Sequence, residues 1–189
     1  MTTSRREHLV NTAQQLFYQN GFRATGIDTV LAESGVAKKT LYNHFKSKDE
    51  LIIATLQQRD LQFMDNLRSS ITRLAPLQNG DPKHARVLAF FDALNEWITS
   101  DNFFGCMFIN ASAEYPRQED PVHVACTNHK RLVIQFIEEL ISDLKLENSH
   151  VLARQLALLA DGAIVNAHTT NDRDAPLQAK RMALVLLQA

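Results

Sequence analysis

Three helix-start signals within the first fifty residues constrain the fold more than any other feature of the sequence. A Ser or Thr followed three residues later by Glu or Asp occurs at residues 4–7, 25–28 and 47–50. In this pattern, the capping box, the two side chains accept hydrogen bonds from backbone N–H groups that the first helical turn leaves unpaired. The first two starts predict helices that begin at Ser4 and near Ile27, and the third predicts a long helix that runs to about residue 74.

The spacing of apolar residues agrees with these starts. Between Leu9 and Phe17 the apolar residues recur on one face of a helix, and Gly21 follows where a left-handed cap would end it. We therefore expect helices over residues 4–20, 27–34 and 37–45.

The rest of the chain also has a helical pattern, because apolar residues recur at helical rather than alternating spacing. Two Asp-Pro pairs, at residues 81–82 and 120–121, predict a helix start with proline in the first turn. The fold class predicted is all-α: an amino-terminal three-helix helix-turn-helix domain at 1–47 and a helical domain at 48–189. The remaining expected helices, which bring the total to about nine, span about 48–74, 82–100, 101–114, 121–144, 149–168 and 175–187.

Charge is distributed unevenly along the chain. Residues 1–48 hold seven basic and three acidic residues, whereas residues 49–189 hold 13 basic and 18 acidic residues, although the whole chain of 189 residues carries a net charge of only −1. A basic segment beside an acidic one predicts that any contact with a polyanion lies at the amino-terminal end. A merely solvated basic face is the alternative.

Composition and cysteine usage indicate a globular protein of the cytoplasm. Hydrophobic residues make up 45% of the chain and charged residues 22%, so wholesale disorder is not expected. No apolar run approaches the ~18 residues of a membrane span, and residues 1–8 lack the apolar stretch of a secretory signal. Cys106 and Cys126 cannot form a disulfide framework, which fits a reducing compartment.

The short helices at 27–34 and 37–45 flank a tight turn that contains Gly35 and predict a helix-turn-helix, whose second helix enters the major groove of DNA. The polar residues of the second helix lie off its apolar face, where they can reach bases or phosphates. A small helical subdomain with a basic surface is the alternative. Expected base contacts are Lys38, Lys39, Thr40 and Asn43; expected phosphate contacts are Tyr42, His44 and Lys48, with Thr25 at a helix start that attracts phosphate.

Residues 16–27 and 34–51 resemble the amino-terminal domain of TetR-family transcriptional regulators, with glycines, caps, aromatic and basic residues in the same order. The resemblance covers roughly residues 4–52, and residues 105–114 are similar to one subgroup. It implies a homodimeric repressor that binds a palindromic operator and whose DNA affinity falls when a small molecule enters the carboxy-terminal domain. Family members commonly carry Gly or Arg at position 39 or 43, so the operator sequence stays open.

The resemblance also implies that the last two long helices, about 149–168 and 175–187, pair with their dimer mates in a four-helix bundle. Their Leu- and Ala-rich faces suit close helix packing, although packing within one chain is the alternative. Dimerisation is also economical, because one short recognition helix reads only a few base pairs, whereas two read half-sites one turn apart.

A pocket for the effector is expected around a polar stripe. Cys106, Asn110 and Glu114 follow one another at intervals of four residues, and Phe63 and Trp97 are candidates for the apolar lining. The alternatives are that the aromatic residues fill the core and that Glu114 faces solvent at a helix end. A redox-sensing Cys106/Cys126 pair is a further alternative.

Other functional classes find little support in the sequence. His123 and His129 lie six residues apart and are poor joint metal ligands, and no Cys-x-x-Cys occurs. No Gly-rich phosphate loop and no ordered nucleophile, base and orienting residue are present. We therefore expect no metal, no cofactor and no enzyme activity, and keep two alternatives: a DNA-binding factor without an effector, and a helical enzyme that uses Cys106.

Overall fold

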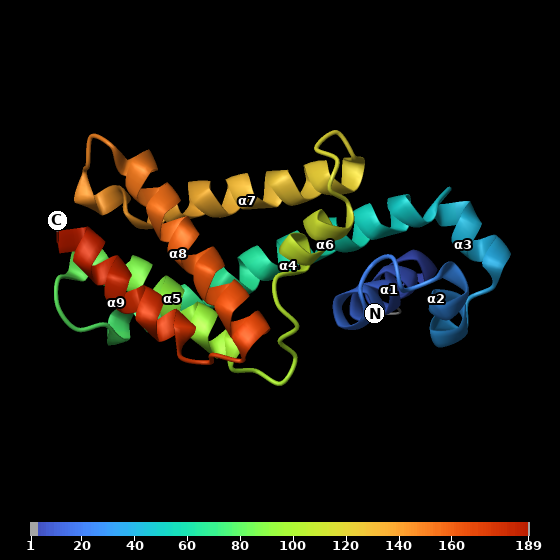
Figure 1. Cartoon of the computed structure of the whole chain (residues 1–189), viewed down its shortest axis with the longest axis horizontal. Coiled ribbons are helices and arrows are strands. Elements are labelled where there is room, and N and C mark those ends of the chain that lie inside the picture. Colours follow the sequence, from blue (N-terminus) through green and yellow to red (C-terminus); the bar gives the residue numbers. More distant parts are fainter. Residues whose placement is uncertain (1–3, 189) are drawn as a thin grey trace. The chain divides into compact units, whose positions relative to one another are not determined.

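The computed structural model describes residues 4–188, and the regular elements among them are helices (Figure 1). Residues 1–3 and 189, at the outer ends of the two predicted domains, lie outside the described residues. None of the described helices combines the length and apolar character that a membrane crossing needs. The α-helices are α1 (Arg5–Asn20), α2 (Ile27–Ser34), α3 (Lys38–His44), α4 (Lys48–Leu74), α5 (Ala85–Ile98), α6 (Met107–Glu114), α7 (Pro121–Leu140), α8 (Ser149–Thr170) and α9 (Ala175–Gln188); the 3-10 turns are η1 (Ala75–Leu77), η2 (Pro82–His84) and η3 (Ser142–Leu144).

Two of the three predicted capping signals form. The Ser4 hydroxyl oxygen accepts a hydrogen bond from the Glu7 N–H at 3.2 Å and begins α1. The Ser47 hydroxyl does the same for the Glu50 N–H at 3.2 Å and begins α4. The Glu50 carboxylate in turn accepts the Lys46 N–H at 2.7 Å. Both helices therefore begin where side chains replace the missing intrahelical partners.

The predicted capping box at residues 25–28 is wrong. The cap of α2 is Gly26, which makes no side-chain hydrogen bond to the helix. The Thr25 hydroxyl instead donates to the Gly21 carbonyl oxygen at 2.8 Å. The helix bounds are nevertheless as predicted, because Gly35 ends α2 in the left-handed conformation, with φ of +65°.

The segment predicted as a helix over 101–114 is helical only from Met107. Gly105 adopts a φ of +81°, which interrupts a right-handed helix. A Cβ atom at Gly105 would lie 2.9 Å from the His168 ring, so a larger residue does not fit there. The helix predicted over 121–144 is also shorter, because α7 ends at Leu140 and the turn η3 follows.

The described chain divides into two compact units. The first contains the residues up to Gln62 together with Met107–His129, and the second contains Phe63–Cys106 and the residues from Lys130 onwards. Helices α1 to α3, α6 and the start of α7 therefore belong to one unit. This division follows packing, and the functional boundary at 47/48 stays a prediction.

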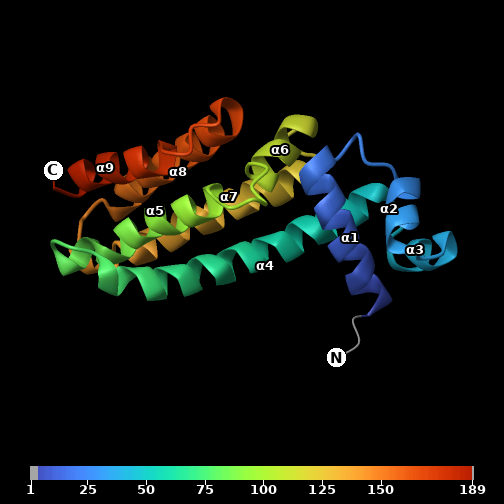
Figure 2. The ribbon, with the colours of Figure 1, turned by 90° about the horizontal axis from the view of Figure 1, so that it is seen from below.

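Within the second unit, α5, α8 and α9 pack side by side (Figures 1 and 2). Small side chains on the buried faces of α8 and α9 allow the helix backbones to approach closely. The residues with these small buried side chains are Ala153, Ala157, Ala160, Ala163 and Ala167 of α8 and Ala175, Ala179 and Ala183 of α9.

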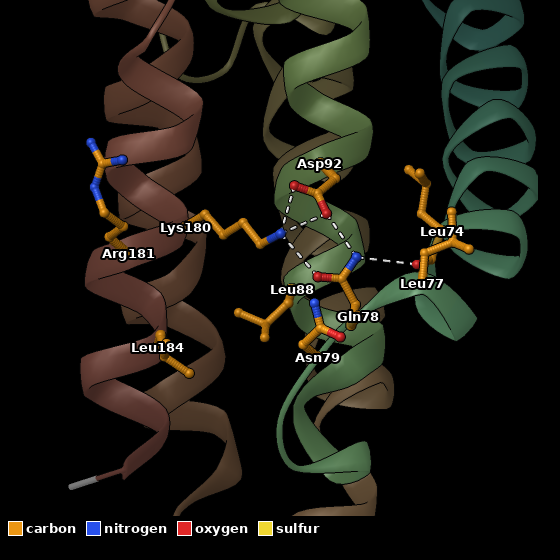
Figure 3. Close-up of a pocket in the computed structure, with 9 residues that line it drawn as sticks. All are labelled: Leu74, Leu77, Gln78, Asn79, Leu88, Asp92, Lys180, Arg181 and Leu184. Atoms are coloured by element: carbon orange, nitrogen blue, oxygen red, sulfur yellow. Dashed lines mark hydrogen bonds and ion pairs between the residues drawn. The ribbon is translucent and has the colours of Figure 1, made fainter.

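A polar network ties α9 to α5 within the same unit (Figure 3). The Lys180 ammonium donates to both carboxylate oxygens of Asp92, at 2.6 and 2.7 Å, and to the Gln78 side-chain oxygen at 2.9 Å. The Gln78 amide donates to Asp92 at 2.7 Å and to the Leu74 carbonyl oxygen at 3.1 Å. Because these polar groups satisfy one another, the network fixes the position of α9 on α5 rather than offering open ligand groups.

Candidate DNA-binding interface

Helix α3 buries its apolar side and leaves its polar side in water. Leu41 is fully buried, and Phe45, the cap residue that follows the helix, is buried as well. Of the residues predicted to contact DNA, Thr40 is half-buried, and the exposed ones are Lys38, Lys39, Tyr42, Asn43 and His44. The structure therefore brings five of the eight predicted DNA contacts to the open surface of one short helix.

Helix α3 is held by α1 and α2. The Arg6 guanidinium lies 5.2 Å from the centre of the Phe45 ring, and His8 Nε2 forms a hydrogen bond with the Ser34 carbonyl oxygen at 3.0 Å. Val30, in the middle of α2, is fully buried. These contacts join α1 to α2 and to the end of α3, and a seven-residue helix depends on such packing because it is not stable alone.

Lys38 and Lys48 already have partners in the protein. Lys38 Nζ lies 3.5 Å from the exposed Asp28 carboxylate, and such an exposed pair contributes little stability. Lys48 Nζ donates to the Arg23 carbonyl oxygen at 3.2 Å. Burial lowers the pKa of Lys48, an effect that the nearby Asp49 and Glu114 carboxylates oppose. Of the two ammonium groups, that of Lys48 is therefore the more firmly positioned by the protein itself.

Thr25 differs from the other predicted contacts because its side chain is only 3% exposed. Its hydroxyl donates within the loop that leads into α2. A phosphate contact at this position therefore depends on backbone N–H groups at the start of α2, as the sequence prediction assumed, and not on the hydroxyl.

Glu114, the last residue of α6, makes contacts that were not predicted from the sequence. Its carboxylate accepts the Phe22 N–H at 2.9 Å and the Arg23 N–H at 2.6 Å. The Arg23 side chain donates through Nε to the Glu114 carbonyl oxygen at 2.8 Å. We call these three hydrogen bonds the Glu114 clamp. The clamp joins positions 91 and 92 residues apart, which no local pattern reveals.

Tyr115 lies beside the clamp. The Arg23 guanidinium is 5.4 Å from the centre of its ring, and the Tyr115 hydroxyl donates to the Asp49 carboxylate at 3.3 Å. Burial and the negative charge of Asp49 raise the pKa of Tyr115 to about 12. The hydroxyl therefore stays neutral and a donor throughout the physiological range.

The residues predicted for the effector pocket fall into both compact units. Phe63 and Trp97 meet edge to face in the second unit, with ring centres 5.4 Å apart. Cys106, also in the second unit, is buried and precedes α6, so it is not on a common helical stripe with Asn110 and Glu114. The Glu114 side chain is half-buried, and its carboxylate accepts the two N–H groups of the clamp. That the five residues line an effector pocket stays a prediction.

His129, a poor metal ligand by its spacing from His123, is buried beside a carboxylate and an aromatic ring. His129 Nδ1 lies 2.6 Å from the Asp60 carboxylate, and its ring stacks on Phe108 at 3.5 Å. These residues border a pocket of about 490 Å³ in the first unit. Among the described residues, no group of three or more His, Cys, Asp or Glu side chains could hold a metal ion.

Comparisons with known proteins agree with this geometry. Residues 9–55 match the family described as "Bacterial regulatory proteins, tetR family". The chain is similar to the crystal structure of SCO4454, a TetR-family transcriptional regulator from Streptomyces coelicolor, with 31% identity and a TM-score of 0.84; the match covers 99% of this chain and 90% of that one.

Curated relatives carry regulator names as well. The HTH-type transcriptional repressor NemR of Escherichia coli K12 is 29% identical over 140 residues, which are 73% of this chain and 67% of NemR. The HTH-type transcriptional activator FasR of Mycolicibacterium smegmatis is 38% identical over 90 residues, which are 47% of this chain and 39% of FasR. Both relatives are named as regulators of transcription.

Proposed function

Because the chain belongs to the TetR family of bacterial regulatory proteins, we propose that it is a repressor that binds a palindromic operator as a homodimer and is released by a small-molecule effector. The observation that carries this proposal is the surface of α3, where exposed polar side chains surround a buried Leu41. A helix of this kind, supported by two others, suits insertion into the major groove. A bacterial regulator of this kind acts in the cytoplasm, where the DNA is.

The side chains of α3 divide into two proposed roles. Lys38, Lys39, Thr40 and Asn43 read base edges, since amide and ammonium groups match the donor and acceptor pattern of the major groove. Tyr42, His44 and Lys48, together with the backbone at Thr25, bind phosphates and set the orientation of the head on the duplex.

The homodimer is proposed to form through an apolar surface on α8 and α9. Val151, Leu158 and Val165 recur every seven residues on α8, and Leu158 is 72% exposed. Val185 on α9 is 67% exposed. Single exposed aliphatic residues are ordinary, but a row of them on two adjacent helices is typical of a protein interface. We propose a second copy of this chain as the occupant.

Repression and release are the finer part of the proposal. NemR is named a repressor and FasR an activator, so the direction of regulation needs its own test. In the proposed mechanism an effector favours a conformation in which α4 swings like a pendulum and moves the two heads off their one-turn spacing. A ~100-fold preference of the effector for that state is worth only ~2.7 kcal/mol, within the usual range of coupling between sites.

The effector pocket is proposed in the second unit, around Phe63, Trp97 and Cys106, and a contribution of Asn110, which belongs to the first unit, stays a prediction. Glu114 is left out because its carboxylate is already hydrogen-bonded to two backbone N–H groups. A Cys106→Trp variant is expected to lose its response to the effector while it keeps DNA binding. An unchanged response in that variant would place the effector elsewhere.

Selection of bound duplexes from a genomic library tests the proposal. We expect enrichment of a sequence with two symmetric half-sites, followed by release in competition with candidate metabolites. If duplexes are enriched but no metabolite releases them and none raises the melting temperature, the protein is a DNA-binding factor without an effector. If no duplex is enriched, the proposal is wrong, and the next hypothesis to test is that the protein is an enzyme that uses Cys106.

A further inference from the structure

The Glu114 clamp places a negative charge where both helix electrostatics and DNA binding disfavour it. Glu114 is the last residue of α6, and a helix carboxyl end favours cations rather than anions. Its charge also lies in the compact unit that contains the helix-turn-helix, which has to approach a polyanion. A carboxylate that breaks two local rules is expected to have a specific role.

The hydrogen bonds of the clamp show what the carboxylate does. Its two oxygens accept N–H groups from the consecutive residues Phe22 and Arg23. Hydrogen bonds to an ionised acceptor are about twice as strong as neutral ones. Arg23 returns a cation to the end of α6 through Nε. The exchange of charges therefore stabilises both the end of α6 and the loop between α1 and α2.

That loop leads directly into the helix-turn-helix. It begins at Gly21, whose φ of +86° ends α1, and Phe22 is buried against Phe17 with ring centres 5.4 Å apart. A Cβ atom at Gly21 would lie 3.2 Å from Glu114 Oε1, so the carboxylate packs tightly on the loop. The conformation of residues 21–26 determines where α2 starts.

Arg23 also connects the clamp to a predicted phosphate contact. The carbonyl oxygen of Arg23 accepts the Lys48 ammonium at 3.2 Å, while its N–H and Nε bind Glu114. Two predicted phosphate-binding groups, the Lys48 ammonium and the backbone at Thr25, therefore depend on the position of one loop.

We propose that Glu114 is a positioning residue for DNA binding: its carboxylate holds the α1–α2 loop in the conformation from which the helix-turn-helix docks. The inference rests on the proposed function. A loop that is already ordered loses less conformational freedom on binding, which raises affinity. Glu114 thereby makes α6, which lies more than sixty residues beyond α3 in the sequence, a part of the DNA-reading unit.

The sign of a mutational effect separates this role from simple electrostatics. Glu114→Gln removes one negative charge, and charge alone would strengthen binding to DNA. The clamp predicts the opposite: operator affinity falls about tenfold in Glu114→Gln and further in Glu114→Ala, the loss expected when about one charge-assisted hydrogen bond no longer orders the loop. Glu119→Gln, an exposed position on the following loop, is the matched control and is expected to bind equally well or slightly better.

The salt dependence and amide exchange complete the test. The slope of log affinity against log salt is expected to stay unchanged in Glu114→Gln, because no phosphate contact is lost. Exchange of the Phe22 and Arg23 amide hydrogens is expected to accelerate at least ~10-fold, since these bonds give them their protection. Exchange elsewhere in α1 to α3 reports whether the fold is intact.

The outcomes separate the inference from the proposed function. If the wild-type protein binds no duplex, both are overturned. If the wild type binds its operator and Glu114→Gln binds equally well or better, or if the two amides exchange at the wild-type rate, the inference alone is overturned. Weaker binding together with faster exchange of these two amides supports it.

Discussion

Helix α3 and the apolar surface on α8 and α9 expose very different side chains. In α3 the exposed groups are polar or charged, such as Lys39 and Asn43, and the apolar Leu41 is buried. In α8 and α9 aliphatic groups such as Leu158 and Val185 remain in solvent although Ala-rich faces are buried. Polar groups on a packed helix can form hydrogen bonds with a charged duplex. A row of exposed aliphatic side chains is stabilised only when another apolar surface covers it and removes it from water.

A charge in the apolar surface on α8 and α9 is expected to have the largest effect on dimerisation and operator affinity. Leu158→Glu places a charge in the proposed dimer interface, so the dimer should dissociate and operator affinity should fall ~100-fold or more, because the second half-site no longer adds to binding. Analytical ultracentrifugation and fluorescence anisotropy measure the two effects. Leu61→Glu is the matched control, since Leu61 is 68% exposed in the first unit; equal loss in both variants would contradict the proposed interface.

Changes on α3 should alter which sequence is bound. Asn43→Ala removes a side-chain amide that can pair with a base, so discrimination at one position of each half-site should fall by ~1–3 kcal/mol, while other positions are still read. Duplex selection with the wild type and the variant measures this directly. Identical base preferences at every position would show that Asn43 does not read bases. Lys39→Ala tests base reading by the preceding turn of α3 in the same way.

A phosphate contact should act on all sequences alike. Lys48→Ala is expected to weaken specific and non-specific duplexes to a similar degree and to lower the salt slope by about one. Because Lys48 also donates to the Arg23 carbonyl, Lys48→Gln is a useful companion that keeps a donor but no charge. An unchanged salt slope in both variants would exclude Lys48 as a phosphate contact.

The smallest expected effect concerns the stability of the first unit at alkaline pH. The pKa of Tyr115 is raised to about 12, so between pH 10 and 12 the unfolded state loses this proton and the folded state keeps it. Stability from this group is therefore complete below pH 10 and is lost as pH rises toward 12. Denaturant titrations should show that wild type loses ~1 kcal/mol more than Tyr115→Phe across this range, a value reduced for solvent screening. Parallel losses would show that the Tyr115 pKa is unshifted.

Local sequence signals predicted most helix bounds because a capping side chain lies within a few residues of the backbone groups that it binds. Ser4 and Ser47 cap helices whose N–H groups lie three residues away. Thr25 has the same pattern, but its hydroxyl donates a hydrogen bond to the Gly21 carbonyl oxygen instead. A capping pattern therefore predicts a helix start well and its hydrogen bonds less well, since a neighbouring acceptor can compete.

The errors lie where distant residues decide the structure. The apolar and aromatic residues between positions 103 and 109 predict a helix over 101–114, but Gly105 packs against His168 and takes a positive φ. The hydrogen bonds of Glu114 were not predicted either, because its partners lie 91 and 92 residues earlier in the sequence. Periodicity along the chain contains no information on such pairings, so the recognition helix was predictable and the clamp was not.

The stoichiometry of the protein on a selected duplex tests the central claim most directly. Native mass spectrometry or sedimentation of the complex should give two chains on a duplex with two half-sites one helical turn apart, about 34–36 Å between centres. Deleting one half-site should abolish tight binding. A single chain bound as tightly to one half-site, or no binding to any duplex even in dilute buffer, would contradict the account.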